Sequence, residues 1–237
     1  MPRRWRPLTG PAASAAIDAS AFARIMGNAL AFCPARSAYP SVRLEILPEA
    51  VRVSASDAYT IGVDHVQAET DGQALACLQR ADAQTLERAA RSERGQDVTL
   101  TIGLGEAEAL PVQLATNVGL PLLPAGTTGH LPDPHVRVSQ LGHGASEADL
   151  YSLIDGLIGR LDGREDPPGV IPWPCDVALD LGLLSAFAKV RHAGPESQIG
   201  DLRMWGSEEP ILVKVGATFR GAIMPHIRDA TPQAMLW

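Results

Sequence analysis

The chain has 237 residues, of which 46% are hydrophobic, and its formal net charge is −7 at pH 7. This length is enough for one large domain or two small ones, and the composition is that of a globular protein. No apolar run reaches the roughly 18 residues of a membrane-spanning helix, and the basic N-terminal segment lacks the apolar stretch of a secretory signal. The acidic balance argues against a protein that binds polyanions over its whole surface, but it is compatible with a local basic face.

The three cysteines, Cys33, Cys77 and Cys175, are far apart in the sequence. They form neither metal-ligand spacing nor a disulfide framework. We therefore expect buried free thiols in a reducing cytoplasm, with no metal and no cofactor.

The chain begins with a tail over residues 1–16 that we expect to run into an edge strand. Asp18 is placed to cap a helix over residues 19–32, because its carboxylate can accept from an amide of the first turn. The apolar residues of this helix fall on one face at helical spacing, which predicts that Arg24 and Asn28 lie outside.

Period-2 alternation within residues 41–69 predicts three strands in a β-meander with one apolar face. Its centre is Val51–Asp64, VRVSASDAYTIGVD, where Asp57 occupies the tight turn between two strands. A second unit with a helix and strands follows, predicted as a strand over 74–79, a helix over 82–93, and strands over 98–102 and 111–115.

Residues 116–134 have the proline and glycine content of a linker, and we expect Leu120, Leu122 and Leu123 to dock onto a surface. The second half then repeats helix and meander. It is predicted as a strand over 135–139, a helix over 147–161, a strand over 177–179, a helix from the cap Asp180 to about 192, and strands over 202–205, 211–215 and 218–224. The predicted fold class is α+β, with helices on one face of antiparallel sheet.

Catalytic signals are weak. His143 and Ser146 lie close together in a glycine-rich loop, which leaves open an unrelated enzyme with a site there, but the loop lacks the strand–turn–helix context of a nucleophile. We therefore expect that the protein is not an enzyme.

The predicted helices carry basic residues on their outer faces, which could follow a phosphate backbone without reading bases. The alternative is an ordinary solvated helix face with an ion pair between Glu87 and Arg91. The basic residues concerned are Arg24, Arg88, Arg91, Lys189 and Arg191.

Several segments, taken in order, resemble the bacterial DNA polymerase III β-subunit sliding clamp. VSASDAYTIGV resembles the strand–turn–strand of that family, and ILVKVGATFRGAIMPHI resembles its closing strands. LGLLSAFAKVR resembles its last helix, and GLPLLPAG the loop that leads to its last domain. The resemblance covers most of residues 18–124 and 176–227.

The resemblance implies two clamp-like domains, one over residues 1–115 and a reduced one over 135–237, joined by the linker 116–134. It also implies a non-enzymatic DNA replication or repair accessory protein whose cleft binds short hydrophobic peptides of polymerases or other partners. The five basic residues would then face double-stranded DNA. The cleft would fall on Ser56, Ala58, Tyr59, Thr60, Ile61, Pro124, Met224 and Pro225.

The chain departs from the family pattern in lacking the N-terminal domain and in having a proline-rich segment, 162–175, where a meander is expected. A two-domain clamp can close around DNA as a homo-oligomer, namely a trimer. The alternative is a monomeric, clamp-derived peptide-binding module that does not encircle DNA.

Overall fold

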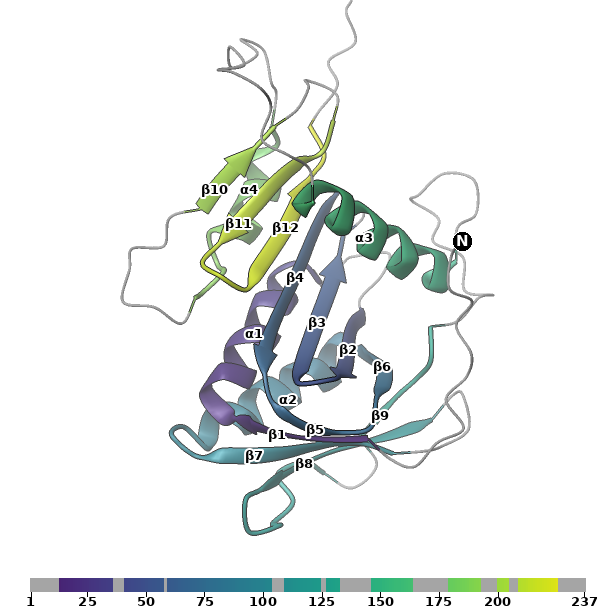
Figure 1. The fold of residues 1–237 in the computed structure, drawn as a ribbon, viewed down its shortest axis with the longest axis vertical. Coiled ribbons are helices and arrows are strands. Elements are labelled where there is room, and N and C mark those ends of the chain that lie inside the picture. The colour runs from purple at the N-terminus through teal and green to yellow at the C-terminus, as the bar shows by residue number, and fades with distance from the viewer. Residues whose placement is uncertain are drawn as a thin grey trace, which may run out of the picture.

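The computed structural model describes residues 13–35, 41–57, 59–103, 109–124, 127–132, 146–163, 179–192, 200–204 and 209–225. Within these ranges the chain forms helices and two antiparallel sheets (Figure 1). The elements are β1 (Ala13–Asp18), α1 (Ala19–Ala31), β2 (Ser41–Leu47), β3 (Ala50–Ser56), β4 (Thr60–Gln67), β5 (Glu69–Asp71), β6 (Ala74–Gln79), α2 (Arg80–Ser92), β7 (Asp97–Ile102), β8 (Leu110–Thr116), β9 (Thr128–Gly129), α3 (Glu147–Asp162), α4 (Leu181–Phe187), β10 (Gly200–Arg203), β11 (Ile211–Val215) and β12 (Phe219–Ile223). The predicted α+β class is confirmed.

The larger sheet joins the two halves of the chain. Its seven strands run in the order β10-β11-β12-β4-β3-β2-β6. The predicted meander is confirmed as β2, β3 and β4, which pair antiparallel in sequence order. Strand β4 then pairs with β12, the last strand of the chain, with Thr60 opposite Ile223. The two halves therefore share one continuous sheet.

Strand β1 corrects the expectation of an edge strand near the N-terminus. The five-stranded sheet runs β5-β1-β7-β8-β9, so β1 has a neighbour on each side. Ala16 lies opposite Glu69 of β5 and opposite Thr99 of β7. The short strand β5 supplies the second neighbour, and its three residues carry no periodicity that would reveal this pairing from the sequence.

The segment after β8 lies along both sheets rather than running free. The amide of Leu122 donates to a carbonyl of β8 over 2.8 Å, and His130 exchanges two backbone hydrogen bonds with Cys77 of β6, at 2.7 and 2.9 Å. Leu122 and Leu123 pack against the core as predicted. Leu120 does not, since it is 62% exposed.

Helix α1 begins at the predicted cap, because Asp18 accepts from the amide of Ala21 over 2.7 Å. The expectation that Asn28 lies outside is wrong, since this side chain is 1% exposed. Its amide nitrogen donates to Asp64 of β4 and to the carbonyl of Arg191, both over 2.7 Å. The amide of Arg191 donates back to Asn28 Oδ1 over 2.8 Å. Polar contacts between distant segments, not apolar spacing, decide where Asn28 faces.

Helices α1, α2 and α4 lie behind the seven-stranded sheet in Figure 1, and three phenylalanines join the ends of α1 and α4 to strand β12. The Phe32 ring lies 4.8 Å from that of Phe187 and 5.6 Å from that of Phe219, measured between centroids. Two glycines make room for these rings: a Cβ on Gly62 would lie 2.3 Å from Phe32, and one on Gly221 would lie 2.6 Å from Phe187. We call this side of the sheet the inner face.

Helix α3 covers the opposite side, the outer face, in front of the sheet in Figure 1. Tyr151 and Ile154 pack there against Val63 of β4. The sequence predicts one apolar face for the meander and therefore a polar face open to solvent. Instead, Arg43 and Glu45 on that polar face are each 2% exposed, because α3 lies over them.

The second half follows the prediction in part. Helix α4 is capped by Asp180, which accepts from the amide of Gly182 over 2.6 Å, but it ends at Phe187 rather than near His192. Strands β10, β11 and β12 form the predicted closing meander. Leu179 is not in a strand, while the predicted strand over 135–139 lies outside the described residues.

Candidate functional site

The turn between β3 and β4 is held by Asp57. Its Oδ1 accepts from the amides of Tyr59 and Thr60, over 3.1 and 2.7 Å, and from the Thr60 hydroxyl over 2.8 Å. Ser56 adds a hydroxyl hydrogen bond to the Thr60 carbonyl over 2.9 Å. A short acidic side chain that binds its own downstream backbone fixes a turn in one conformation. Tyr59 therefore leaves the turn in a defined direction.

The end of β12 meets this turn. The amide of Met224 donates to the Tyr59 carbonyl over 2.9 Å, one step beyond the pairing of Ile223 with Thr60. Tyr59 is 56% exposed and Met224 41% exposed, and one residue further in, Ile61 lies opposite Ala222. Alternation along each strand places the four side chains on the outer face. We call Tyr59, Ile61, Ala222 and Met224 the outer-face cluster.

The remaining cleft residues predicted from the sequence have different places. Ser56, Thr60 and Pro225 are buried, so the first two hold the turn and do not form surface. Pro124 is exposed, and the amide of Thr127 donates to its carbonyl beside β8. That position is on the five-stranded sheet, away from β12, and the contacts found among the described residues do not bring Pro124 to the cluster. Ala58 lies outside the described residues.

Helix α3 ends against the cluster. Leu161 forms a small apolar core of the outer face with Leu212 and Ala222, and Ile61, Leu157 and Ile158 pack against this core. Sequence reasoning did not assign Ala222 to the site, although its period-2 spacing from Met224 is a usable signal. It also did not place α3, since an apolar stripe on a helix does not say which surface it covers.

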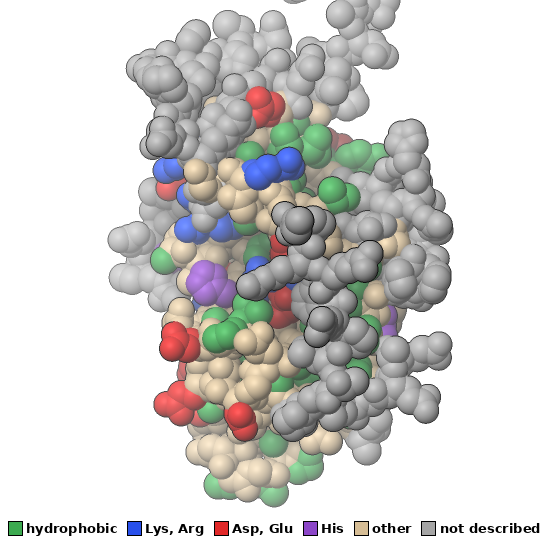
Figure 2. All heavy atoms as spheres, turned by 45° about the vertical axis from the view of Figure 1, so that its right-hand side comes forward, with side chains coloured by type: hydrophobic (Ala, Val, Ile, Leu, Met, Phe, Trp, Pro, Cys, Tyr) green, Lys and Arg blue, Asp and Glu red, His purple; other side chains and the backbone are tan. Residues whose placement is uncertain are grey.

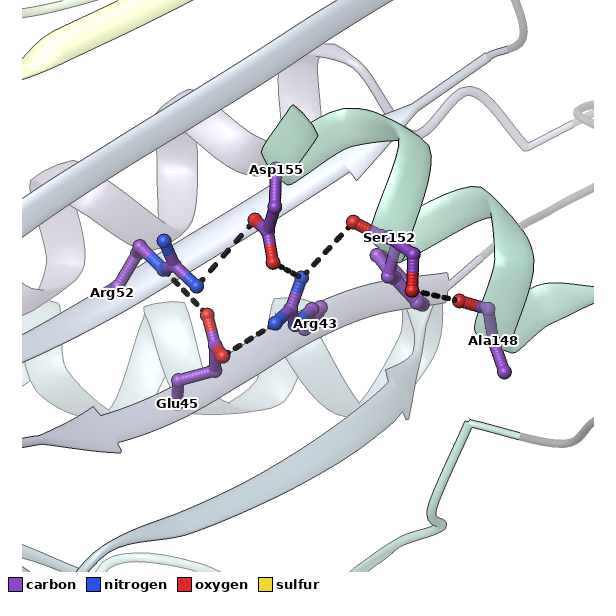
Figure 3. A network of polar contacts seen from close by, with 7 residues as sticks. Arg43, Glu45, Arg52, Ala148, Ser152 and Asp155 are labelled. Carbon is purple, nitrogen blue, oxygen red and sulfur yellow. Dashed lines mark hydrogen bonds and ion pairs between the residues drawn. The ribbon is translucent and has the colours of Figure 1, made fainter. Parts of the chain in front are cut away.

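An ionic network holds the middle of α3 to the sheet (Figure 3). Asp155 accepts from Arg43 over 2.9 Å and lies 3.5 Å from Arg52, and both arginines bind Glu45 over 2.6 Å. Burial alone would lower the pKa of Arg52, but the hydrogen bond and charge of Glu45 and the charge of Asp155 raise it above its usual value. Each charged side chain of the network lies beside a partner of opposite charge.

The basic residues assigned to DNA lie on or near the inner-face helices. Arg24 is half-buried and donates to Asp64 over 2.9 Å, which corrects the expectation that it lies outside. Arg88 and Arg91 are exposed on α2, and Arg91 pairs with Glu87. Lys189 and Arg191 are exposed but follow α4 rather than lying on it.

The alternative site at His143 and Ser146 has little support. Ser146 is 3% exposed, and His143 lies outside the described residues. In the part of the chain that the structure covers, no three histidine, cysteine, aspartate or glutamate side chains are grouped to hold a metal. No helix there has the length and apolar character to cross a membrane.

Figure 2 shows hydrophobic and basic side chains on the upper part of the visible surface, where some acidic side chains also lie, and a group of acidic side chains at the lower left. The upper part is where β12 and α3 lie in Figure 1.

No protein-family model matches the sequence, and no curated protein matches it. Solved structures do match. The β sliding clamp of Caulobacter crescentus superposes with a TM-score of 0.57 at 19% identity, over 95% of this chain and 67% of the clamp. For the polymerase III β subunit of Thermotoga maritima the TM-score is 0.54 at 13% identity, over 97% and 70%.

The chain has the fold of bacterial sliding clamps. A third neighbour, the clamp of Bartonella birtlesii bound to griselimycin, has a TM-score of 0.55 at 13% identity, over 92% of this chain and 66% of that clamp. This clamp-like chain spans about two thirds of the length of these neighbours. The resemblance that four short motifs predict thus extends to the fold.

Proposed function

We propose that this protein is a non-enzymatic, clamp-like accessory protein that binds short hydrophobic peptides of DNA replication or repair factors at the outer-face cluster. The observation that carries the proposal is the backbone hydrogen bond between Met224 and Tyr59, which sets two exposed apolar side chains side by side. They come from opposite halves of the chain, yet neighbouring strands of one sheet present them.

The chemistry of the cluster suits varied peptide side chains. A methionine is flexible and polarisable, and an aromatic ring offers a rigid apolar face. Half-buried Ile61 adds apolar surface beside them, and buried Ala222 lies next to it under α3. The neighbours add support: the Caulobacter clamp carries polyethylene glycol at a region proposed to tether the β-motif, and the Bartonella clamp carries griselimycin.

The test is a fluorescence anisotropy titration with a panel of labelled peptides of about six residues that combine leucine and phenylalanine, and with griselimycin as an unlabelled competitor. We expect the wild type to bind a member of the panel. The double variant Tyr59→Ala/Met224→Ala should lose at least about tenfold in affinity. The control Leu181→Ala/Leu202→Ala removes two exposed apolar side chains elsewhere and should bind like the wild type. Equal affinity in both double variants contradicts the site.

The monomeric module and the ring differ in how they use the outer strands of the sheets. Among the described residues these strands are β10 and β6 in the larger sheet and β5 and β9 in the smaller one, and β6 also forms one isolated bridge with His130 of the same chain. An outer strand can pair with a second chain. Sedimentation distinguishes the two assemblies, since a monomer favours the module and a trimer favours the ring.

A DNA-encircling clamp is the second candidate, because exposed Arg88, Arg91, Lys189 and Arg191 lie on or near the inner-face helices. Retention on nicked circular DNA that is lost when the DNA is linearised would favour this candidate. If Arg88→Ala/Arg91→Ala does not weaken the salt-dependent binding of DNA, these two arginines do not contact DNA.

A further inference from the structure

Helix α3 occupies surface that belongs to the outer-face cluster. Two of the four cluster residues lie in contact with α3: buried Ala222 shares a small apolar core with Leu161, and Ile61 packs against that core together with Leu157 and Ile158. The other two, Tyr59 and Met224, remain exposed at the next step along the same strands. A peptide that reached from the exposed pair onto Ile61 would meet α3.

Some of the contacts between α3 and the sheet are polar, and water can replace them when the helix detaches. Asp155, which binds Arg43 and Arg52, is itself 35% exposed. The hydroxyl groups of Tyr151 and Ser41 lie 3.0 Å apart and add one hydrogen bond. When α3 detaches from the sheet, its charged and polar groups are hydrated again. Detaching α3 therefore costs less free energy than detaching a helix that packs only against apolar side chains.

Two glycines in α3, Gly156 and Gly159, lower the stability of the helix, and no neighbouring atom requires a glycine at either position. A Cβ built on Gly156 or on Gly159 meets nothing within 4 Å. In contrast, Gly62 and Gly221 are required by the rings that lie against them. Glycine in a helix interior disfavours the helix relative to alanine, because the free chain loses more conformational freedom on ordering. Alanine would therefore fit at both positions and strengthen the docked helix.

We propose that α3 is an internal ligand of the outer-face cluster, and that a partner peptide binds fully only by displacing it. This inference rests on the proposed function. The partner segment would offer aliphatic or aromatic side chains in place of Leu157, Ile158 and Leu161. The apparent affinity for that segment is then the intrinsic affinity multiplied by the fraction of molecules in which α3 is undocked.

The experiment compares variants that shift the docking of α3 but leave Tyr59 and Met224 intact. The first is Gly156→Ala/Gly159→Ala, which strengthens the docked helix. The second is Asp155→Ala, which removes both ion pairs to the sheet. The control is Gly27→Ala in α1, where a Cβ lies at an ordinary 3.8 Å from Glu87 Oε1. It makes the same chemical change in a helix that does not cover the cluster.

The probe is the tightest labelled peptide of the leucine–phenylalanine panel. We expect the double alanine variant to bind it about tenfold more weakly than the wild type, from a few-fold per glycine. Asp155→Ala should bind it severalfold more tightly, and Gly27→Ala should match the wild type. Hydrogen exchange of the α3 amides should accelerate when the peptide is added to the wild type.

The outcomes separate this inference from the proposed function. Equal affinities in all four proteins, or unchanged exchange of α3 in the complex, overturn the inference but leave peptide binding standing. Binding by Asp155→Ala alone supports the inference, since the helix would then mask the site in the wild type. If Asp155→Ala does not fold, the affinity of Gly156→Ala/Gly159→Ala still tests the inference. Binding by none of the variants overturns the proposed function and the inference with it.

Discussion

Asn28 and Arg191, 163 residues apart in the chain, bind each other in both directions, since the Asn28 side chain donates to the Arg191 carbonyl and accepts from its amide. The same side chain also donates to Asp64. One buried amide thus fastens α1 to the inner-face segment after α4 and to β4. The two halves of the chain meet through this contact as well as through the pairing of β4 with β12.

Replacement of Asn28 by alanine should therefore weaken the whole fold. We expect a loss of about 2–3 kcal/mol in the free energy of unfolding, because buried Asp64 loses a donor and the partly buried backbone groups of Arg191 lose their partner. Urea unfolding followed by tryptophan fluorescence measures this. Asn117→Ala, at an exposed position, is the control and should change stability by less than about 0.5 kcal/mol. Equal effects of the two variants would show that the Asn28 contact contributes nothing.

Gly62→Ala should destabilise the protein by about 1–3 kcal/mol, because the added Cβ would lie 2.3 Å from the Phe32 ring and force the aromatic group to move. Thermal unfolding of the variant and of the wild type measures this loss of stability. Gly156→Ala makes the same change where the Cβ meets open space, and it should raise stability slightly. A stable Gly62→Ala variant would mean that the packing of Phe32 against β4 is looser than described.

Asp57→Ala should loosen the turn that presents Tyr59, because three hydrogen bonds to Oδ1 are lost. We expect about 1–2 kcal/mol less stability and weaker peptide binding. Asp57→Asn keeps an oxygen acceptor and should recover most of both. If alanine and asparagine behave alike in the anisotropy titration, the turn does not govern the site.

The pH dependence of stability should carry a signature of Cys33. Burial raises the pKa of its thiol from 9.0 to about 11, although the charge of Arg80 acts in the opposite direction. Because the folded protein holds this proton more tightly, the contribution to stability is complete below pH 9 and is lost as the pH rises toward 11. Between about pH 8 and about pH 10.5 the wild type should lose about 2 kcal/mol more than Cys33→Ala. Parallel curves from urea unfolding would contradict this assignment.

Local patterns were sufficient to predict the strands and the turn. Alternation around Asp57 locates β3 and β4, and Asp18 marks the start of α1, because each of these signals acts within a few residues. The sequence likeness of the turn to a clamp motif, together with that of the last strand, also anticipates that Tyr59 and Met224 meet. Both belong to short segments whose pairing the fold determines.

Long-range contacts could not be predicted in the same way. The polar residues Arg43 and Glu45 are typical of a solvent-facing sheet, and only the placement of Asp155 on α3 explains their burial. The burial of Asn28 could not be predicted for the same reason, since its partners come from β4 and from the segment after α4. Pro124 follows the order of the clamp motifs in the sequence, yet its loop is held to the five-stranded sheet.

The most direct test of the peptide site is methyl NMR of protein labelled at isoleucine and methionine, titrated with the tightest peptide of the panel. The account predicts that the methyl signals of Met224 and Ile61 shift as the peptide binds. Those of Ile25 and Met26, fully buried in α1 on the inner face, serve as internal references and should stay in place. Shifts confined to other methyl groups, with Met224 and Ile61 unmoved at saturation, would contradict the account.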